Sequence, residues 1–260
     1  MRSKKGIGVF AIAALALALL VSLVVPFAAT PVEAHAPLGA GEPAEYELED
    51  IWIYDVDGKP LKISIEDVAE AHGDLCICVA CAFRVTQAAI SKLWDLEEEY
   101  PRQGELLVIY HHPSSGHKDA FEYILSKDCD TLEIPEGTSI QHLTLDNYVY
   151  TFTRTDTGDT FETRVKEGVF PQGFFELRYK VVGYDKGWHQ DEPTDVERAE
   201  FAAKWTQARD NFLTMEAWEL FEAIEEEGEE PLPTAAITFT GILALLLLIG
   251  GIYSWRGRRR

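Results

Sequence analysis

The alternation of apolar and polar residues predicts a hairpin followed by two helices in the first part of the chain. Residues 51–54 (Ile-Trp-Ile-Tyr) have the composition of a strand, and residues 61–65 supply a partner strand after an Asp-Gly turn. Residues 65–71 favour a short helix. Asp74 is expected to cap a longer helix that runs to about Glu98. The apolar stripe of that helix consists of Val79, Phe83, Ala89, Ile90 and Trp94.

The pattern in the rest of the body predicts further strands and two more helices. A helix over residues 118–126 can be capped by Ser114 or Ser115. Residues 194–227 have helical periodicity, with a break expected near Asp210. The stretches with the composition or alternation of strands are 105–110, 148–155, 161–165 and 174–182. We therefore expect an α+β fold, in which helices pack on a mostly antiparallel sheet.

Both ends of the chain are strongly apolar. Residues 1–34 begin with basic residues, continue with a long apolar run and end in Val-Glu-Ala, which predicts a secretory signal or an uncleaved anchor. Residues 235–255 are uncharged and long enough to span a bilayer, and four arginines follow within residues 256–260. Because basic residues stay on the cytoplasmic side, we expect a single-pass protein of the cell membrane with its main domain outside and its C-terminus cytoplasmic. Later trimming of the C-terminal segment is the alternative.

These boundaries divide the chain into six parts. They are a signal or anchor (1–34), a linker (35–49), an α+β ectodomain (50–228), an acidic, proline-containing stalk (229–234), a transmembrane helix (235–255) and a basic cytoplasmic tail (256–260).

The predicted ectodomain is strongly acidic. Residues 35–234 contain 16 Lys and Arg against 43 Asp and Glu, a net charge of −27. The hydrophobic content of the chain, 47%, is that of a globular protein, so this is not a disordered acidic tail. Such a charge argues against binding nucleic acid through a basic patch. It favours a solvated acidic surface and leaves homo-oligomerisation or an unidentified protein partner open.

The candidate chemistry is concentrated in residues 72–81, which hold one histidine and three of the four cysteines. Thiolate and imidazole are the side-chain ligands that Zn²⁺ prefers. Cys76 is expected at a helix N-terminus, where free backbone N–H groups and the helix dipole stabilise a thiolate. Cys78 and Cys81 are three residues apart and can project from one helical face. His72 lies just before them, so the segment predicts a metal site.

A second segment is needed to complete such a site, because one short helix rarely lets four ligands reach the same ion. The predicted strand-to-helix turn holding His111, His112 and His117 is the expected donor. Two other interpretations stay open at this point. The cysteines can be buried or disulfide-paired, with Cys129 as the only plausible long-range partner. Alternatively, Cys78 and Cys81 can cycle between dithiol and disulfide.

The first cluster carries a specific resemblance. His72, Gly73, Leu75 and Cys76 fit the motif His-Gly-His-x-Cys-Pro-Gly of the formylmethanofuran dehydrogenase E-subunit family, which the chain resembles over about 110 residues, up to residue 182. Three motif positions differ: Asp74, Ile77 and Cys78 stand where the motif has its second His, Pro and Gly. Downstream, the chain has no zinc-ribbon pair of Cys-x-x-Cys motifs.

The resemblance implies an α+β metal-binding domain with His72 and Cys76 as ligands. His117 stands near a position where the family often has a cysteine. The family takes its name from an association with the molybdenum or tungsten enzyme that makes formylmethanofuran in methanogens, which are archaea. The predicted export signals place this domain on the other side of the membrane, so we carry over the fold and the metal site but not the metabolic role.

We therefore expect a membrane-tethered, outward-facing metal-binding domain, with Zn²⁺ as the most suitable ion. The expected ligands are His72, Cys76, Cys78 and His117; the supporting or alternative ligands are Asp74, Cys81, His111 and His112. Asp74 is expected to orient a histidine from outside the ligand shell. Whether the domain is an enzyme is left open. The alternatives are a thiol–disulfide redox protein that uses Cys78 and Cys81, and a non-catalytic partner-binding ectodomain.

Overall fold

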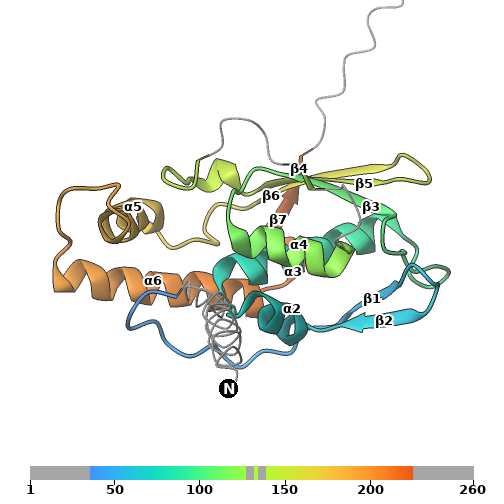
Figure 1. The fold of residues 1–260 in the computed structure, drawn as a ribbon, viewed down its shortest axis with the longest axis horizontal. Coiled ribbons are helices and arrows are strands. Elements are labelled where there is room, and N and C mark those ends of the chain that lie inside the picture. Colours follow the sequence, from blue (N-terminus) through green and yellow to red (C-terminus); the bar gives the residue numbers. More distant parts are fainter. Residues whose placement is uncertain (1–35, 127–131, 134–138, 225–260) are drawn as a thin grey trace, which may run out of the picture.

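The computed structural model describes residues 36–126, 132–133 and 139–224 (Figure 1). The predicted signal or anchor, stalk, transmembrane segment and basic tail lie outside these residues, as does Cys129. None of the helices within the described ranges combines the length and the apolar character needed to cross a bilayer.

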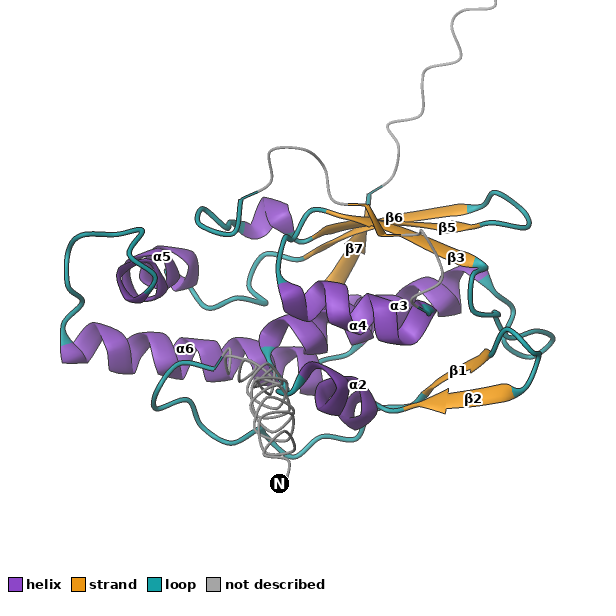
Figure 2. Cartoon of the chain, in the orientation of Figure 1, coloured by secondary structure: helices purple, strands orange, loops and turns teal. Residues whose placement is uncertain are grey.

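The structure is an α+β fold with two sheets (Figure 2). Strands β1 (Ile51–Tyr54) and β2 (Pro60–Ile63) form the predicted hairpin. The larger sheet has the order β4-β3-β5-β6-β7, and only the β3–β4 pair is parallel. Its strands are β3 (Leu106–Tyr110), β4 (Leu132–Glu133), β5 (Val149–Arg154), β6 (Thr160–Val165) and β7 (Phe221–Ala223). The expected fold class, helices on a mostly antiparallel sheet, is confirmed.

Helix α3 (Ile77–Leu93) lies at the centre of the molecule, between the larger sheet and α6 (Asp195–Thr214) (Figures 1 and 2). Helix α4 (Ser115–Leu125) packs against α3 and α2 (Ile65–His72). Helix α5 (Phe174–Asp185) packs on α6 at the end of the molecule opposite the β1–β2 hairpin (Figure 1). A short helix, α7 (Ala217–Leu220), leads into β7 at the end of the described residues, and a short 3-10 turn, η1 (Leu145–Asn147), precedes β5. Every residue of the predicted apolar stripe of α3 is buried.

The boundary between α2 and α3 sets the geometry of the cysteine segment. Ser64 and Asp67 form a capping box at the start of α2, and Gly73 ends it with a φ of 96°, a conformation that favours glycine. The N-cap of α3 is Cys76. The prediction of Asp74 as the cap was therefore wrong, because the chain turns at Gly73 and enters α3 only after Cys76, whose backbone is extended.

Two predictions in the C-terminal half were wrong. Residues 174–182 form helix α5 and not a strand, because Phe174, Arg178 and Val181 recur at helical spacing and pack toward α6 and the cavity described below. The helix predicted to break near Asp210 continues through that residue to Thr214 and gives way at Met215. Residues 217–223 then form α7 and β7, so the end of the predicted helix instead supplies an edge strand.

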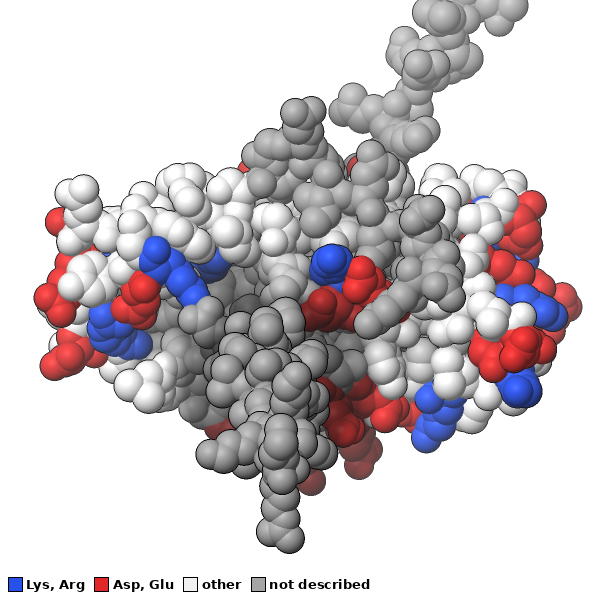
Figure 3. Space-filling view, viewed as in Figure 1, with Lys and Arg blue, Asp and Glu red and all other residues white. Residues whose placement is uncertain are grey.

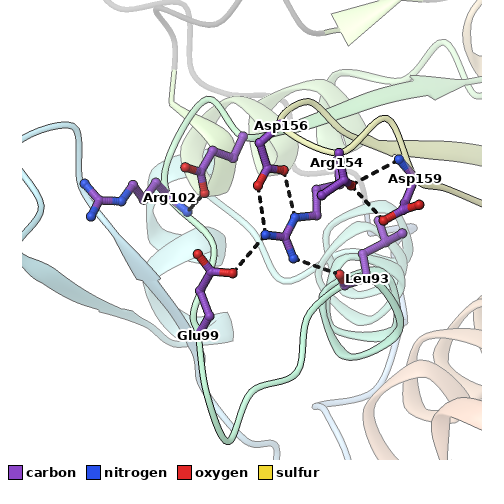
Figure 4. A network of polar contacts seen from close by, with 8 residues as sticks. Leu93, Glu99, Arg102, Arg154, Asp156 and Asp159 are labelled. Atoms are coloured by element: carbon purple, nitrogen blue, oxygen red, sulfur yellow. Dashed lines mark hydrogen bonds and ion pairs between the residues drawn. The ribbon is translucent and has the colours of Figure 1, made fainter.

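Arg154 fixes the C-terminal end of α3 to the sheet (Figure 4). Its guanidinium donates to Asp156 at 2.7 and 2.8 Å, to Glu99 at 2.8 Å and to the carbonyl of Leu93 at 3.2 Å. It also lies over the ring of Trp94, 4.7 Å from the ring centroid. The carbonyl bond satisfies one of the acceptors left free at the helix end. Because Arg154 belongs to β5, this contact holds α3 in register with the strand that carries Tyr150.

The described surface is mixed but acidic. On the face shown in Figure 3, acidic side chains lie at both ends of the molecule and also near its middle, with basic side chains interspersed among them. Most of the ion pairs involve exposed groups, such as Lys59 with Asp57, and such pairs add little stability. The excess of acidic residues thus lies on the solvent-exposed surface.

Candidate metal centre

Two helix N-termini meet at the cysteine segment. Cys76 caps α3, and Ser114 caps α4 by accepting a hydrogen bond from the backbone of His117. Gly116 allows this approach: a Cβ atom placed on it would lie only 2.7 Å from Cβ of Cys78 and 3.1 Å from Sγ of Cys76. The absence of a side chain at Gly116 therefore brings the cysteines of α3 against the first turn of α4.

Cys78, His112 and His117 form a compact group of metal-ligating side chains. One ligand atom from each lies within 4.8 Å of the other two. Both histidines are buried, and their rings stack with centroids 4.4 Å apart. Atoms bound to one Zn²⁺ lie about 3.5 Å apart, because each is about 2.0–2.3 Å from the ion. A contraction of about 1 Å would thus bring the three donors to the separations that zinc requires.

His112 is the least satisfied side chain of the group. Only 1% of the residue is exposed, yet neither ring nitrogen has a hydrogen-bond partner among the described residues. A buried polar atom without a partner carries a free-energy penalty of about 1–3 kcal/mol. A metal ion bound by one ring nitrogen would remove part of that penalty, so His112 fits a metal site.

His117 is held by hydrogen bonds on both ring nitrogens. Its Nδ1 lies 3.0 Å from Oγ of Ser114, and its Nε2 lies 2.7 Å from the hydroxyl of Tyr150. The same hydroxyl lies 3.1 Å from Sγ of Cys81. Ser114 also lowers the pKa of Cys78, so this serine acts on both His117 and Cys78.

A second chain of contacts leads to Cys78 from the opposite side. Nδ1 of His72 donates to the carboxylate of Asp119 at 2.7 Å. Nε2 of His72 and Sγ of Cys76 lie close together beside Gly116, 3.5 and 3.1 Å from the position that a Cβ atom would take there. Asp119, His72 and Cys76 therefore lie in a series that connects α4, α2 and α3, and Cys76 in turn lowers the pKa of Cys78.

These contacts favour the ligand form of the cluster. Cys76, and after it Ser114, lowers the pKa of Cys78 although burial opposes the shift. The interaction with Cys78 and burial raise the pKa of Cys76, so Cys78 is the more acidic thiol of the pair. The pKa of His72 is raised to about 9 by Cys76 and then by Asp119.

The other two histidines are shifted in the opposite direction. Burial lowers the pKa of His117 to about 3 and that of His112 well below its usual range. Both rings are therefore neutral at physiological pH, and neutral imidazole is the form that binds metals.

The group lies at the wall of a cavity of about 610 Å³. Cys76, Cys78, His112 and Ser114 contribute one part of its lining, and Arg178 of α5 contributes another. Much of the remaining wall is apolar, with Phe174, Val181, Trp188, Phe201 and Trp205. A cavity with an apolar wall and few polar groups is typical of a small-molecule site.

The structure brings together only some of the residues predicted from sequence. Cys78 and His117 lie in the compact group, and His112, predicted as an alternative ligand, joins them. His72 and Cys76 lie beside the group, and their role as ligands stays a prediction.

The other supporting residues lie apart from the compact group. Cys81 is buried against Tyr150, and the backbone of His111 pairs with Val149 at the edge of β5. Asp74 does not bond to a histidine: its Oδ2 is buried without a partner among the described residues, and Asp119 occupies the supporting place beside His72. Within the part of the chain that the structure describes, Cys76, Cys78 and Cys81 are free thiols.

Sequence reasoning missed Asp119, Tyr150 and Arg178. Asp119 follows His117 by two residues, and only the packing of α4 against α2 brings it to His72. Tyr150 lies on a correctly predicted strand with its side chain facing the core. The alternating pattern could therefore predict that Tyr150 is buried, but not that it contacts His117. Arg178 lies on a helix predicted as a strand; the spacing of Phe174, Arg178 and Val181 was the signal that could have found it.

The fold and the site define a class: an α+β domain with a Cys/His group suited to a transition metal, placed where two helix N-termini meet beside a cavity. A comparison with known families identifies the particular member of this class. The family model described as FmdE, molybdenum formylmethanofuran dehydrogenase operon, matches residues 71–222, more than half of the chain. The chain belongs to the FmdE family, and the resemblance read from residues 72–76 is confirmed. No curated protein and no solved structure matches the chain.

Proposed function

We propose that this FmdE-family domain binds one divalent transition metal, preferentially Zn²⁺, through Cys78, His112 and His117. The observation that carries the proposal is His112, a fully buried imidazole with two nitrogens that have no partner among the described residues, within reach of the sulfur of Cys78 and a second neutral imidazole. Two nitrogens and one sulfur form a donor set that suits zinc better than magnesium or calcium, which prefer oxygen.

The neighbouring residues have distinct tasks in this proposal. Ser114 and Tyr150 fix the orientation of the His117 ring, with Nδ1 toward Ser114 and Nε2 toward Tyr150, and one of these two contacts is replaced when that nitrogen binds the metal. Asp119 and His72 hold the thiol of Cys76 beside Cys78, where Cys76 can serve as a fourth ligand. A zinc ion with only three protein ligands keeps a position open for water or substrate and acts as a Lewis acid. The cavity beside Cys78 and His112 gives a small molecule access to that position.

The proposal is tested by the metal content of the full-length chain, purified in a neutral detergent without chelators or a polyhistidine tag. Near-stoichiometric zinc is expected. After exchange for Co²⁺, the protein should show thiolate-to-cobalt charge-transfer absorption in the near ultraviolet, since Cys78 supplies a sulfur ligand. A protein that retains no metal after incubation with Zn²⁺, Ni²⁺ or Co²⁺ and dialysis would contradict the proposal.

We also propose that the domain is tethered to the cell membrane and faces outward. The support is the sequence alone: the uncharged segment at residues 235–255 and the arginines at residues 256–260. A membrane-impermeant amine-reactive biotin reagent is expected to label the lysines of the domain in intact cells. The labelled protein should stay in the membrane fraction after an alkaline carbonate wash. Labelling that requires cell lysis, or release by the wash, would refute the topology.

A further inference from the structure

Arg178 is the unusual cation of the cavity. It projects from α5 into the lining that also contains Cys78, His112 and Tyr148. Among the described residues, the groups that act electrostatically on its guanidinium are Tyr148 and Cys78, and no carboxylate is among them. Arginine stays charged in proteins, so a partly buried guanidinium without a carboxylate partner favours binding of an anion in the cavity.

The second arginine of the cavity is different. Arg198 lines the same space, but both carboxylate oxygens of Asp185 accept from it, at 3.0 and 3.1 Å. Its charge is thus neutralised within the protein. Arg198 therefore has a counter-ion within the protein, whereas no carboxylate among the described residues pairs with Arg178. Arg178 is thus the arginine of this cavity that is available to bind an anionic ligand.

One of the groups that interact electrostatically with Arg178 is Cys78, a residue of the proposed metal centre. Burial lowers the pKa of Arg178, and the negative forms of Tyr148 and Cys78 are the groups that oppose this shift. Burial holds the pKa of the Tyr148 hydroxyl well above its usual range, so this residue stays neutral. Cys78 is the thiolate proposed to bind the metal, and its charge is shared with the ion when the site is filled. Arg178 then faces the cavity with its charge unopposed.

We propose that Arg178 recognises the anionic group of an organic ligand whose apolar body lies against the wall formed by Val181, Phe201 and Trp205. The planar guanidinium can donate two parallel hydrogen bonds to a carboxylate or to a phosphate. The position of this anion beside a metal ion rests on the function proposed above, whereas the anion site itself does not. The ligand class is therefore a small amphipathic anion, held with its charged end near Cys78 and His112.

The test uses the full-length chain in neutral detergent and isothermal titration calorimetry with three probes. Benzoate and phenyl phosphate supply the two anionic groups on an apolar ring, and benzamide has the shape of benzoate without its charge. Benzoate or phenyl phosphate is expected to bind the wild type, with the tighter of the two identifying the anionic group. Arg178→Gln should weaken this binding by about 10-fold or more, as expected for loss of hydrogen bonds to a charged group. Binding of benzamide should not change.

Arg198→Gln is the matched control, because Arg198 lines the same cavity but is paired with Asp185. It should leave the affinity for the anion within about twofold of the wild type, since a paired cation contributes little to a new anion. If Arg178→Gln does not fold, Arg178→Lys keeps the charge but not the planar fork, and it should still weaken binding of the tighter of the two anions. Equal affinities of that anion for the wild type and the Arg178 variants, equal affinities of the wild type for that anion and benzamide, or no binding of either anion would overturn the inference.

The titrations are repeated on zinc-loaded and metal-free protein to separate the two proposals. Binding that depends on Arg178 in both forms supports the anion site, whether or not zinc is a natural occupant. A protein that binds zinc but shows no dependence on Arg178 overturns the anion site and leaves the metal centre intact.

Discussion

Cys78→Ser is expected to lower the affinity of the protein for Zn²⁺ by at least about 100-fold, more than the loss of an outer-shell partner usually causes. Cys78 is the sulfur of the compact group and the residue whose pKa Cys76 and Ser114 lower. A serine hydroxyl does not ionise near neutral pH and cannot replace the thiolate. The affinity is measured by competition with a chromophoric chelator. Thermal unfolding gives a second readout: Zn²⁺ at about 100 times its Kd should raise the Tm of the wild type by about 5–11 °C.

Cys81→Ser is the matched control for this experiment. Cys81 lies on the same helix, three residues away, but it is fully buried and hydrogen-bonded to Tyr150. A serine there can keep that hydrogen bond, so zinc affinity should stay close to that of the wild type. Full zinc binding by Cys78→Ser would refute the ligand assignment. A wild type that holds no zinc, but reversibly loses two thiols on oxidation in a manner that requires both cysteines, would instead favour the dithiol alternative.

Gly116→Ala is expected to lower the free energy of unfolding by about 1–3 kcal/mol, the usual effect of overpacking a tight contact. The added Cβ would lie 2.7 Å from Cβ of Cys78, an atom fixed to the backbone of α3 that no rotamer change can move. The N-termini of α3 and α4 must therefore separate. This separation moves Cys78 away from His117, so zinc affinity should fall as well. Thermal unfolding of the metal-free protein and zinc competition measure the two effects separately.

Gly183→Ala provides the control for the Gly116 substitution. Gly183 also lies in a helix, but an added Cβ would be 3.2 Å from Cβ of His189 in the turn after α5, so a displacement of only a few tenths of an ångström would relieve the contact. Here the higher helix propensity of alanine, worth up to about 1 kcal/mol, should offset the contact. Zinc affinity should be unchanged. If Gly116→Ala is as stable as Gly183→Ala and binds zinc equally well, the close approach of the two helices does not control the site.

The predictable parts of the fold are those in which local pattern and burial agree. The β1–β2 hairpin, α3 and β3 follow from alternation, periodicity and turn residues close in sequence. Helix α5 was missed because its apolar residues satisfy both a two-residue and a helical period over a short stretch. Its contact with α6 decides between them, and that contact joins residues distant in sequence.

The candidate site could likewise be predicted only where its residues lie close together in sequence. Clustering in sequence was enough to find Cys78 and to suggest the histidines after β3. The choice of His112 over His111 depends on which side of the chain turns inward after β3, and this is set by the pairing of His111 with Val149. Asp119 and Arg178 reach the site only through helix packing. No local pattern contains that information.

Helix α2 extends beyond the N-terminal boundary of the family match. The family match begins at residue 71, whereas α2 begins at Ile65 and is capped by Ser64. His72 thus falls within the family span, while Ile65 and Val68, which anchor its helix in the core, lie before that span. The stretch recognised as inherited is shorter than the stretch that must fold cooperatively to hold His72 beside Cys76. Sequence variation upstream of the family boundary can therefore tune the site without altering any residue by which the family is recognised.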